Sequence, residues 1–201
     1  MSSADPLAPI LAALEHGFGG TSDYDLNPDV VLAPGRNLRP AGVLVTVLGQ
    51  GPETRVVLTK RSSALRHHPG QIAFPGGKQD ASDPDIRATA LREAREEIGL
   101  DPGTVEILCH LPRHETVTGF DVTPVLARVH APFAPLPDRG EVAEVFDVPL
   151  AHLMDLGMYR VEKRRWKGDW RRYYAVPFGP YYIWGATARI LRMMAVMAGR
   201  S

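Results

Sequence analysis

The spacing of apolar and polar residues predicts strands and helices that follow one another in mixed order. Two β-rich apolar runs, 41–48 and 55–59, lie on either side of the turn sequence 49–52 and predict a hairpin. The other runs typical of paired strands are 105–111, 121–129, 159–166 and 170–176. Together with the helical patterns described next, they predict an α/β protein.

Three further segments complete the expected order of elements. A polar loop containing His114 and Glu115 is expected to join the strands in the middle of the chain. The proline-rich stretch 131–137 predicts another loop, and 141–148 predicts a short strand-like segment that enters Pro149.

The clearest helical pattern lies at 87–98. Asp83 is placed to cap this helix, Pro84 to occupy its first position, and Gly99 to end it with left-handed backbone. Its expected buried side is formed by Leu91, Ala94 and Ile98, which fall within one narrow arc. Other helical patterns occur at 6–16, 150–156 and 187–198.

Three glutamates share an adjoining arc of the same helix. Glu93, Glu96 and Glu97 fall within about 100° of one another, and like charges at this spacing destabilise a helix. A hard divalent cation with oxygen ligands would compensate, and Arg92 is placed to hold a carboxylate by a forked hydrogen bond. The alternative is a solvated helix face, the commonest fate of a charge run. The glycine-rich stretch before the helix, at 76–77, favours the metal interpretation because glycines allow backbone to approach a ligand closely.

The composition limits the classes of partner and the cellular compartment that we expect for the protein. The 201 residues allow one compact domain, and 44% apolar with 23% charged residues is typical of a soluble globular protein. Lys and Arg equal Asp and Glu at 23 each, so no global field favours nucleic acid or an anionic membrane. Cys109 has no second cysteine to pair with and is expected to be a buried strand residue. With no signal peptide or membrane span in the pattern, we expect a cytoplasmic protein.

The segment 92–100, Arg-Glu-Ala-Arg-Glu-Glu-Ile-Gly-Leu, resembles the end of the Nudix box. This box is the signature of hydrolases that cleave nucleoside diphosphates linked to another group. Its pattern is Gly, five residues, Glu, seven residues, then Arg-Glu-apolar-x-Glu-Glu-x-Gly-apolar. Counting from Gly77, the chain has Asp83 where Glu is usual, and eight residues instead of seven separate it from Arg92. The resemblance therefore assigns roles to the helix glutamates but none to the earlier acid.

A second motif, at 58–77, resembles that of the coenzyme A-hydrolysing branch of the same family. It reads Leu-Thr-x-Arg-Ser, three residues, Arg, three residues, Gly, three residues, Phe-Pro-Gly-Gly. That branch also carries the longer spacing before Arg92, and only Val57 departs from the usual opening leucine. The candidate substrate-binding residues implied by this motif are Arg61, Arg66, Phe74, Gly76 and Gly77.

The resemblance implies the Nudix fold, a mixed β-sheet sandwiched between α-helices, over residues 41–198. Residues 1–40 are then an N-terminal extension with a short helix and an irregular connection. The implied reaction is metal-dependent hydrolysis of the pyrophosphate of coenzyme A or a derivative. Its products would be 3',5'-ADP and 4'-phosphopantetheine, and its cofactor Mg²⁺ or Mn²⁺.

The resemblance also implies roles for individual side chains. Glu93 and Glu97 are the expected metal ligands, with Glu96 third and the carbonyl of Gly77 joining them; Arg92 completes this catalytic set. In Nudix enzymes a loop glutamate near 141–144 can act as the general base. The candidates here are Glu141 and Glu144, although surface charge is the commoner role for each.

Several alternatives remain open at this point. One is a Nudix hydrolase of ADP-ribose or a dinucleotide polyphosphate, and another is a non-catalytic nucleotide-binding module. The basic, tryptophan-containing segment 159–176 resembles a single-stranded nucleic-acid surface, but the neutral net charge argues against that partner. The apolar side of 187–198 is consistent with a homodimer and equally with core packing.

Overall fold

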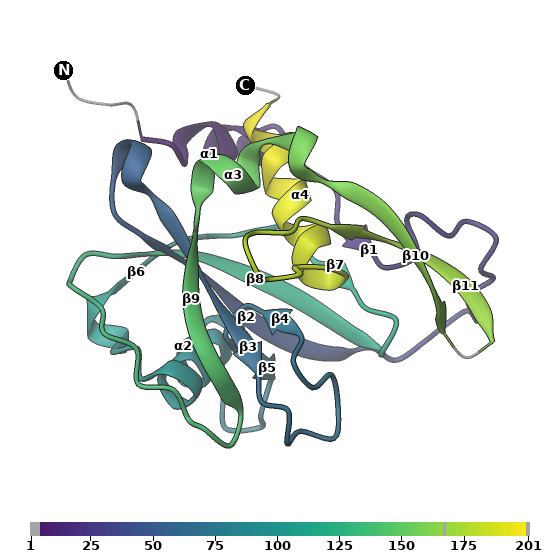
Figure 1. Cartoon of the computed structure of the whole chain (residues 1–201), viewed down its shortest axis with the longest axis horizontal. Helices are drawn as coiled ribbons and strands as arrows, with labels where there is room; N and C mark the ends of the chain where they lie inside the picture. Colours follow the sequence, from purple (N-terminus) through teal and green to yellow (C-terminus); the bar gives the residue numbers. More distant parts are fainter. Residues whose placement is uncertain (1–4, 167, 200–201) are drawn as a thin grey trace.

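The computed structural model describes residues 5–166 and 168–199. Within these ranges, one mixed sheet lies between helices, with α2 on one face and α1, α3 and α4 on the other (Figure 1). The helices are α1 (Ala8–Glu15), α2 (Ile86–Ile98), α3 (Leu150–Met154) and α4 (Ala186–Ala198). The strands of the sheet are β1 (Thr21–Ser22), β2 (Arg39–Leu48), β3 (Arg55–Arg61), β4 (Ile72–Ala73), β5 (Gly76–Lys78), β6 (Val105–His110), β7 (His114–Glu115), β8 (Phe120–Val129) and β9 (Val142–Pro149).

The central strand β2 determines where the rest of the sheet lies. It runs parallel to β8 along its whole length, from Arg39 opposite Phe120 to Leu48 opposite Val129. It pairs with β3 only beside the connecting turn, so the expected hairpin forms but its strands soon separate. In the space that opens, β5 pairs with the beginning of β2 and β4 pairs with the end of β3, while β9 pairs with the other edge of β3 along its whole length. This separation brings the glycine-rich β5 into the sheet.

The alternation of side chains along the strands builds a core on each face. On one face Leu44, Val57 and Val125 pack with Ala90, Ala94 and Ile98 of α2. On the other face the larger cluster combines strand residues with α1, α3 and α4; it includes Val45, Val56, Leu58, Leu126, Ile10, Leu153 and Leu191. Because α1 joins this cluster and β1 pairs with β7, residues of the expected N-terminal extension share the core and the sheet.

The start of α2 differs from the expectation. The N-cap is Asp85, which accepts a hydrogen bond from the backbone N–H of Ala88 at 2.8 Å. Asp83 does not cap the helix, because its carboxylate is bound by Arg92 instead. The expected end is confirmed, since Gly99 adopts left-handed backbone with φ of 70°.

Two other expectations change with the structure. The apolar side of α4 is buried in the core of the protein. The apolar surface that was consistent with a homodimer is therefore explained by core packing. His114 and Glu115, expected in a polar loop, form strand β7. His114 is completely buried there, and Thr21 and Asp23 provide hydrogen-bond partners for its two ring nitrogens. Cys109 is half-buried in β6, and this burial raises the pKa of its thiol.

The hairpin β10 (Arg160–Trp166) and β11 (Asp169–Ala175) forms a separate two-stranded sheet. It projects away from the main sheet, as Figure 1 shows at the right of the view. An isolated hairpin is marginally stable in water, so its contacts with neighbouring segments are important for its position. Among the described residues, no helix has the length and apolar character needed to cross a membrane.

Candidate active site

The last two turns of α2 place two glutamates against the glycines of β5. The backbone N–H of Gly76 donates a hydrogen bond to Oε2 of Glu97 at 3.2 Å. Gly77 lies so close to Glu93 that a Cβ added to it would stand 2.5 Å from Oε1 of the carboxylate. Gly76 has φ of 152°, and a Cβ there would meet the backbone of Gly42 and Val43 at 2.4 and 2.6 Å. The Gly-Gly pair is therefore required sterically by both the sheet and the carboxylates.

Glu97 is a buried carboxylate in an unfavourable electrostatic environment. Only 4% of the residue is exposed, and this burial raises its pKa to about 8. Glu93 and Glu141 repel the charged form further, while the Gly76 amide and Arg61 offset part of the effect. Burial also raises the pKa of Glu93, although its neighbour Arg92 opposes that shift. A carboxylate buried beside others of its kind is a site that favours a cation.

Arg92 connects the loop before the helix to the glutamates on it. Its guanidinium holds Asp83 through two hydrogen bonds of 2.9 Å, and the same group lies 3.0 Å from oxygens of Glu93 and Glu96. The Asp83 side chain is almost fully buried and also accepts a hydrogen bond from Thr89 Oγ1 at 3.0 Å. Asp83 thus has a structural role that the unusual spacing of the box had obscured. The sequence signal for this role was an acidic residue that lies one position further from Arg92 than the box usually places it.

Glu96 differs from the other two glutamates of the helix. Its side chain is 60% exposed, and its carboxylate is engaged by Nη1 of Arg92. Of the three expected metal ligands, it is therefore the one that the observed arrangement favours least.

The two candidate bases occupy different environments. Glu141 lies in the turn before β9, where its carbonyl accepts a hydrogen bond from the Ser62 amide at 2.8 Å. Its charge is close enough to Glu93 and Glu97 to raise the pKa of both. Glu144, further along β9, accepts a hydrogen bond from the hydroxyl of Tyr181. The structure therefore brings Glu141 to the helix glutamates and engages Glu144 elsewhere.

The candidate substrate-binding residues of the 58–77 motif lie in different environments. Arg61, at the end of β3, is near enough to Glu97 to stabilise its charge, and its Nε is buried with no hydrogen-bond partner among the described residues. Arg66 lies in the exposed loop that follows. Phe74, expected to contact substrate, directly follows β4 and is instead 4% exposed, because its ring packs in the larger core cluster.

The donor set suits a small, hard cation held by few protein ligands. Among the described residues there is no group of three or more His, Cys, Asp or Glu side chains placed to hold a metal. Mg²⁺ is commonly bound by one or two carboxylates, with waters and substrate phosphates completing its shell. Glu93 and Glu97, close together on a rigid helix and next to a glycine backbone, meet that requirement.

Comparisons with known proteins agree with this arrangement. The family model described as the NUDIX domain matches residues 38–170. The protein named "Uncharacterized Nudix hydrolase NudL" of Cronobacter sakazakii (strain ATCC BAA-894) is 41% identical over 163 residues, which cover 81% of this chain and 84% of that protein. The protein of the same name from Escherichia coli O139:H28 (strain E24377A / ETEC) is 38% identical over 184 residues, covering 89% and 95%.

Similarity to solved structures extends to the fold. The crystal structure of a Nudix hydrolase from M. smegmatis, RenU, superposes with a TM-score of 0.53 at 22% identity, covering 81% of this chain and 88% of that one. A MutT/nudix family protein from Enterococcus faecalis gives 0.50 at 16% identity, covering 84% and 64%. Both support a mixed sheet between helices as the shared architecture.

Proposed function

Because the chain belongs to the Nudix hydrolase family, whose members cleave nucleoside diphosphate derivatives, we propose that its substrate is coenzyme A or one of its derivatives. The reaction is hydrolysis of the pyrophosphate, which yields 3',5'-ADP and 4'-phosphopantetheine or its acylated form. The observation that carries the proposal is the position of Arg61. This arginine of the 58–77 motif is within electrostatic range of Glu97, and its buried Nε has no hydrogen-bond partner among the described residues.

A guanidinium with an unsatisfied donor, within electrostatic range of Glu97, suits a diphosphate. Arg61 presents a planar set of donors that match phosphate oxygens. The exposed Arg66 follows in the loop above it and adds positive charge on the approach to the site. Arg61 therefore binds the diphosphate, and Arg66 attracts it.

Glu93 and Glu97 are the residues that would hold Mg²⁺ or Mn²⁺. When bound, the ion supplies charge neutralisation at the phosphate oxygens and a water of lowered pKa. Arg92 keeps Glu93 in place while it is itself fixed by Asp83. The Gly76 amide orients the Glu97 carboxylate, and Gly77 leaves room for that of Glu93.

Glu141 is the residue that we assign as the proton acceptor. It is exposed and within electrostatic range of Glu93 and Glu97. A general base must lie within hydrogen-bond reach of the water that it deprotonates, and Glu141, on the turn before β9, is the candidate that is near the helix glutamates. Glu144 remains bound to Tyr181 and takes no part.

The proposal is tested by identifying products by mass spectrometry. Purified protein with Mg²⁺ is incubated separately with coenzyme A, ADP-ribose, a dinucleotide polyphosphate and a nucleoside triphosphate. We expect 3',5'-ADP and 4'-phosphopantetheine to form faster than the products of the other reactions. Cleavage of ADP-ribose without cleavage of coenzyme A would leave the catalytic helix intact and reject the proposed substrate.

A further inference from the structure

Two arginines on one face of the β10–β11 hairpin lie directly opposite each other. Arg164 of β10 is the register partner of Arg171 of β11. Like charges directly across a strand pair destabilise it, and neither arginine has an ion-pair partner among the described residues. Moreover, Nε and Nη1 of Arg171 are buried, and neither has a hydrogen-bond acceptor among the described residues. Glu162 and Asp169 share this face by strand alternation, but among the described residues neither forms an ion pair with the two arginines. The face therefore presents guanidinium donors that nothing described in the protein satisfies.

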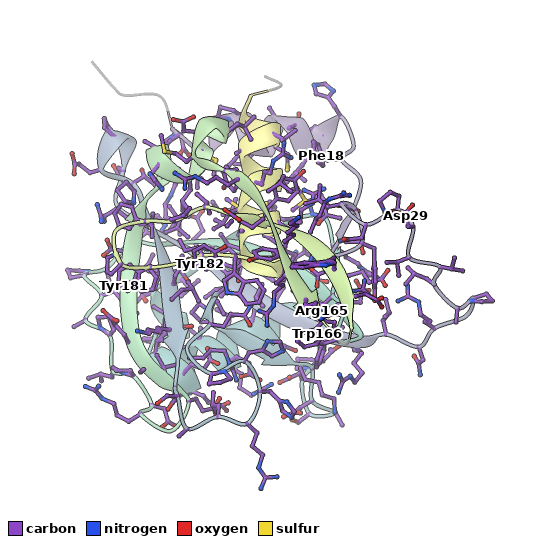
Figure 2. The ribbon with its side chains drawn as sticks, turned by 45° about the vertical axis from the view of Figure 1, so that its right-hand side comes forward. Phe18, Asp29, Arg165, Trp166, Tyr181 and Tyr182 are labelled. Atoms are coloured by element: carbon purple, nitrogen blue, oxygen red, sulfur yellow. The ribbon has the colours of Figure 1, made fainter. Side chains whose placement is uncertain are left out.

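Aromatic rings surround these guanidinium groups. Arg164 lies 4.7 Å from the ring centroid of Trp184 and 5.8 Å from that of Trp166, and Arg171 lies 5.5 Å from that of Tyr24. Figure 2 shows Trp166 at the far end of the hairpin. Such contacts fix the planes of the guanidinium groups without neutralising their charge. Positive groups flanked by flat rings match a ligand that carries both a phosphate and a base.

Arg61, His68 and Arg164 lie along the path from the active site to this face. Arg61 is within electrostatic range of Glu97 on one side and of His68 on the other. His68 in turn is within range of Arg164. Loss of solvent around its ring lowers the pKa of His68, and repulsion by Arg61, His67 and Arg164 adds to the effect. The contacts agree: Arg164 lies over the ring of Trp184, and a Cβ added to the next residue, Gly185, would stand 3.7 Å from Nε2 of Gln71 in the loop that leads into the glutamates.

We propose that Arg164 and Arg171, with His68 beside them, form a second phosphate subsite that holds a phosphomonoester of the substrate. The subsite rests on the proposed function, because the 3'-phosphate of coenzyme A is separated from its diphosphate by a single ribose. Arg61 and the helix glutamates engage the diphosphate, while the hairpin engages the 3'-phosphate. ADP-ribose and dinucleotide polyphosphates have no such group, so the subsite selects against them.

The test compares coenzyme A with dephospho-coenzyme A, which lacks only the 3'-phosphate. For the unaltered protein we expect kcat/KM to be higher for coenzyme A by roughly tenfold or more, as charge-assisted hydrogen bonds produce. Arg164→Gln should bring this ratio close to one by lowering kcat/KM for coenzyme A alone. Because Arg164 is exposed, this variant should fold; Arg171→Gln provides the second measurement on the same face.

Arg165→Gln is the matched control. Arg165 is the next residue of β10 and is also exposed, but it points to the opposite face, where its partner in register is Trp170. The ratio should remain that of the unaltered protein. An equal loss in the Arg164 and Arg165 variants would indicate a diffuse basic surface, of the kind that binds nucleic acid, and would overturn the proposal.

Failure of the subsite can be separated from failure of the proposed function. Cleavage of coenzyme A and dephospho-coenzyme A with equal efficiency would keep the function and reject the subsite. If neither is cleaved, calorimetric titration with 3',5'-ADP and with AMP still measures the subsite directly. Tighter binding of 3',5'-ADP that is lost in Arg164→Gln would support it, and equal binding of the two nucleotides would overturn it.

Discussion

Arg92 holds Asp83 through two hydrogen bonds, from Nε to Oδ1 and from Nη2 to Oδ2, each 2.9 Å long. The remaining nitrogen, Nη1, lies 3.0 Å from Oε1 of Glu93 and from Oε2 of Glu96. One side chain thus fixes the loop that precedes α2 and the carboxylates that α2 presents. The stability of the loop and the geometry of the active site are therefore coupled.

This coupling predicts a pH-dependent loss of stability in Asp83→Asn. The hydrogen bonds from Arg92, together with that from the Asp80 amide, hold the pKa of Asp83 well below its ordinary value of 3.8. A carboxyl whose pKa is lowered by folding stabilises the protein above 3.8, and this contribution disappears as the pH falls further. We expect the variant to melt a few degrees lower at pH 7, with the difference shrinking toward pH 3.

Thermal unfolding followed by circular dichroism between pH 3 and pH 7 measures this difference. Asp80→Asn is the control, because the Asp80 carboxylate lies 3.8 Å from Arg92 and is 59% exposed. Its melting temperature should stay within about a degree of the unaltered protein, as an exposed ion pair contributes little. A constant deficit of Asp83→Asn at all pH values would show that the pair's charge is not what stabilises the loop.

Glu97→Gln should abolish turnover without unfolding the protein. The amide oxygen of glutamine can still accept the hydrogen bond from Gly76, so the helix and β5 keep their contact. Loss of the carboxylate should lower kcat by at least about a hundredfold, since even outer partners of metal ligands cost 10–100-fold. Glu96→Gln, which alters an exposed carboxylate, should lose less than about tenfold. Steady-state kinetics with saturating Mg²⁺ decide the matter, and undiminished turnover in Glu97→Gln would contradict the metal assignment.

Gly77→Ala should impair activity more than stability. The added methyl group would stand 2.5 Å from Oε1 of Glu93, so this flexible side chain must move, while the backbone of Gly77 lies outside the left-handed region. We expect kcat to fall by about tenfold or more, with a small change in melting temperature. Gly19→Ala is the control, because no atom lies within 4 Å of its added Cβ. Equal activity of the two variants would place Glu93 outside the chemistry.

Glu141→Gln and Glu144→Gln should have different effects on kcat. Glu141 is close to Glu93 and Glu97, and removal of a general base typically costs 10²–10⁴-fold. Glu144 is bound by Tyr181, so its variant should keep kcat within a few-fold of the unaltered protein. The pH–rate profile adds a second measurement, since loss of the base should remove the rise of kcat on the acidic side. A larger effect at Glu144 would reverse the assignment.

Features that depend on local sequence were the most predictable. The helix 87–98 and its end at Gly99 follow from apolar spacing and from the backbone freedom of glycine, and both are confirmed. The β10–β11 hairpin likewise follows from two alternating runs around a turn. The position of Glu93 and Glu97 on one side of that helix follows from the same periodicity.

Features that depend on distant partners could not be predicted in the same way. His114 is buried because Thr21 and Asp23, more than 90 residues before it in the chain, bind its ring. Phe74 belongs to the motif that is implied to bind substrate. The motif alone does not show whether the ring of Phe74 packs in the core or faces the substrate. Asp83 was expected to cap the helix and was given no role in the box because its spacing differs by one residue, whereas the fold needs only that its carboxylate reach Arg92.

The central claim, that coenzyme A is the substrate, is tested most directly by internal competition. Coenzyme A and ADP-ribose are mixed in equal amounts with the protein and Mg²⁺, and the remaining substrates and products are followed by mass spectrometry. The ratio of their initial consumption gives the ratio of kcat/KM. We predict that coenzyme A disappears first and that 3',5'-ADP accumulates. Consumption of ADP-ribose ahead of coenzyme A would contradict the assignment of the substrate.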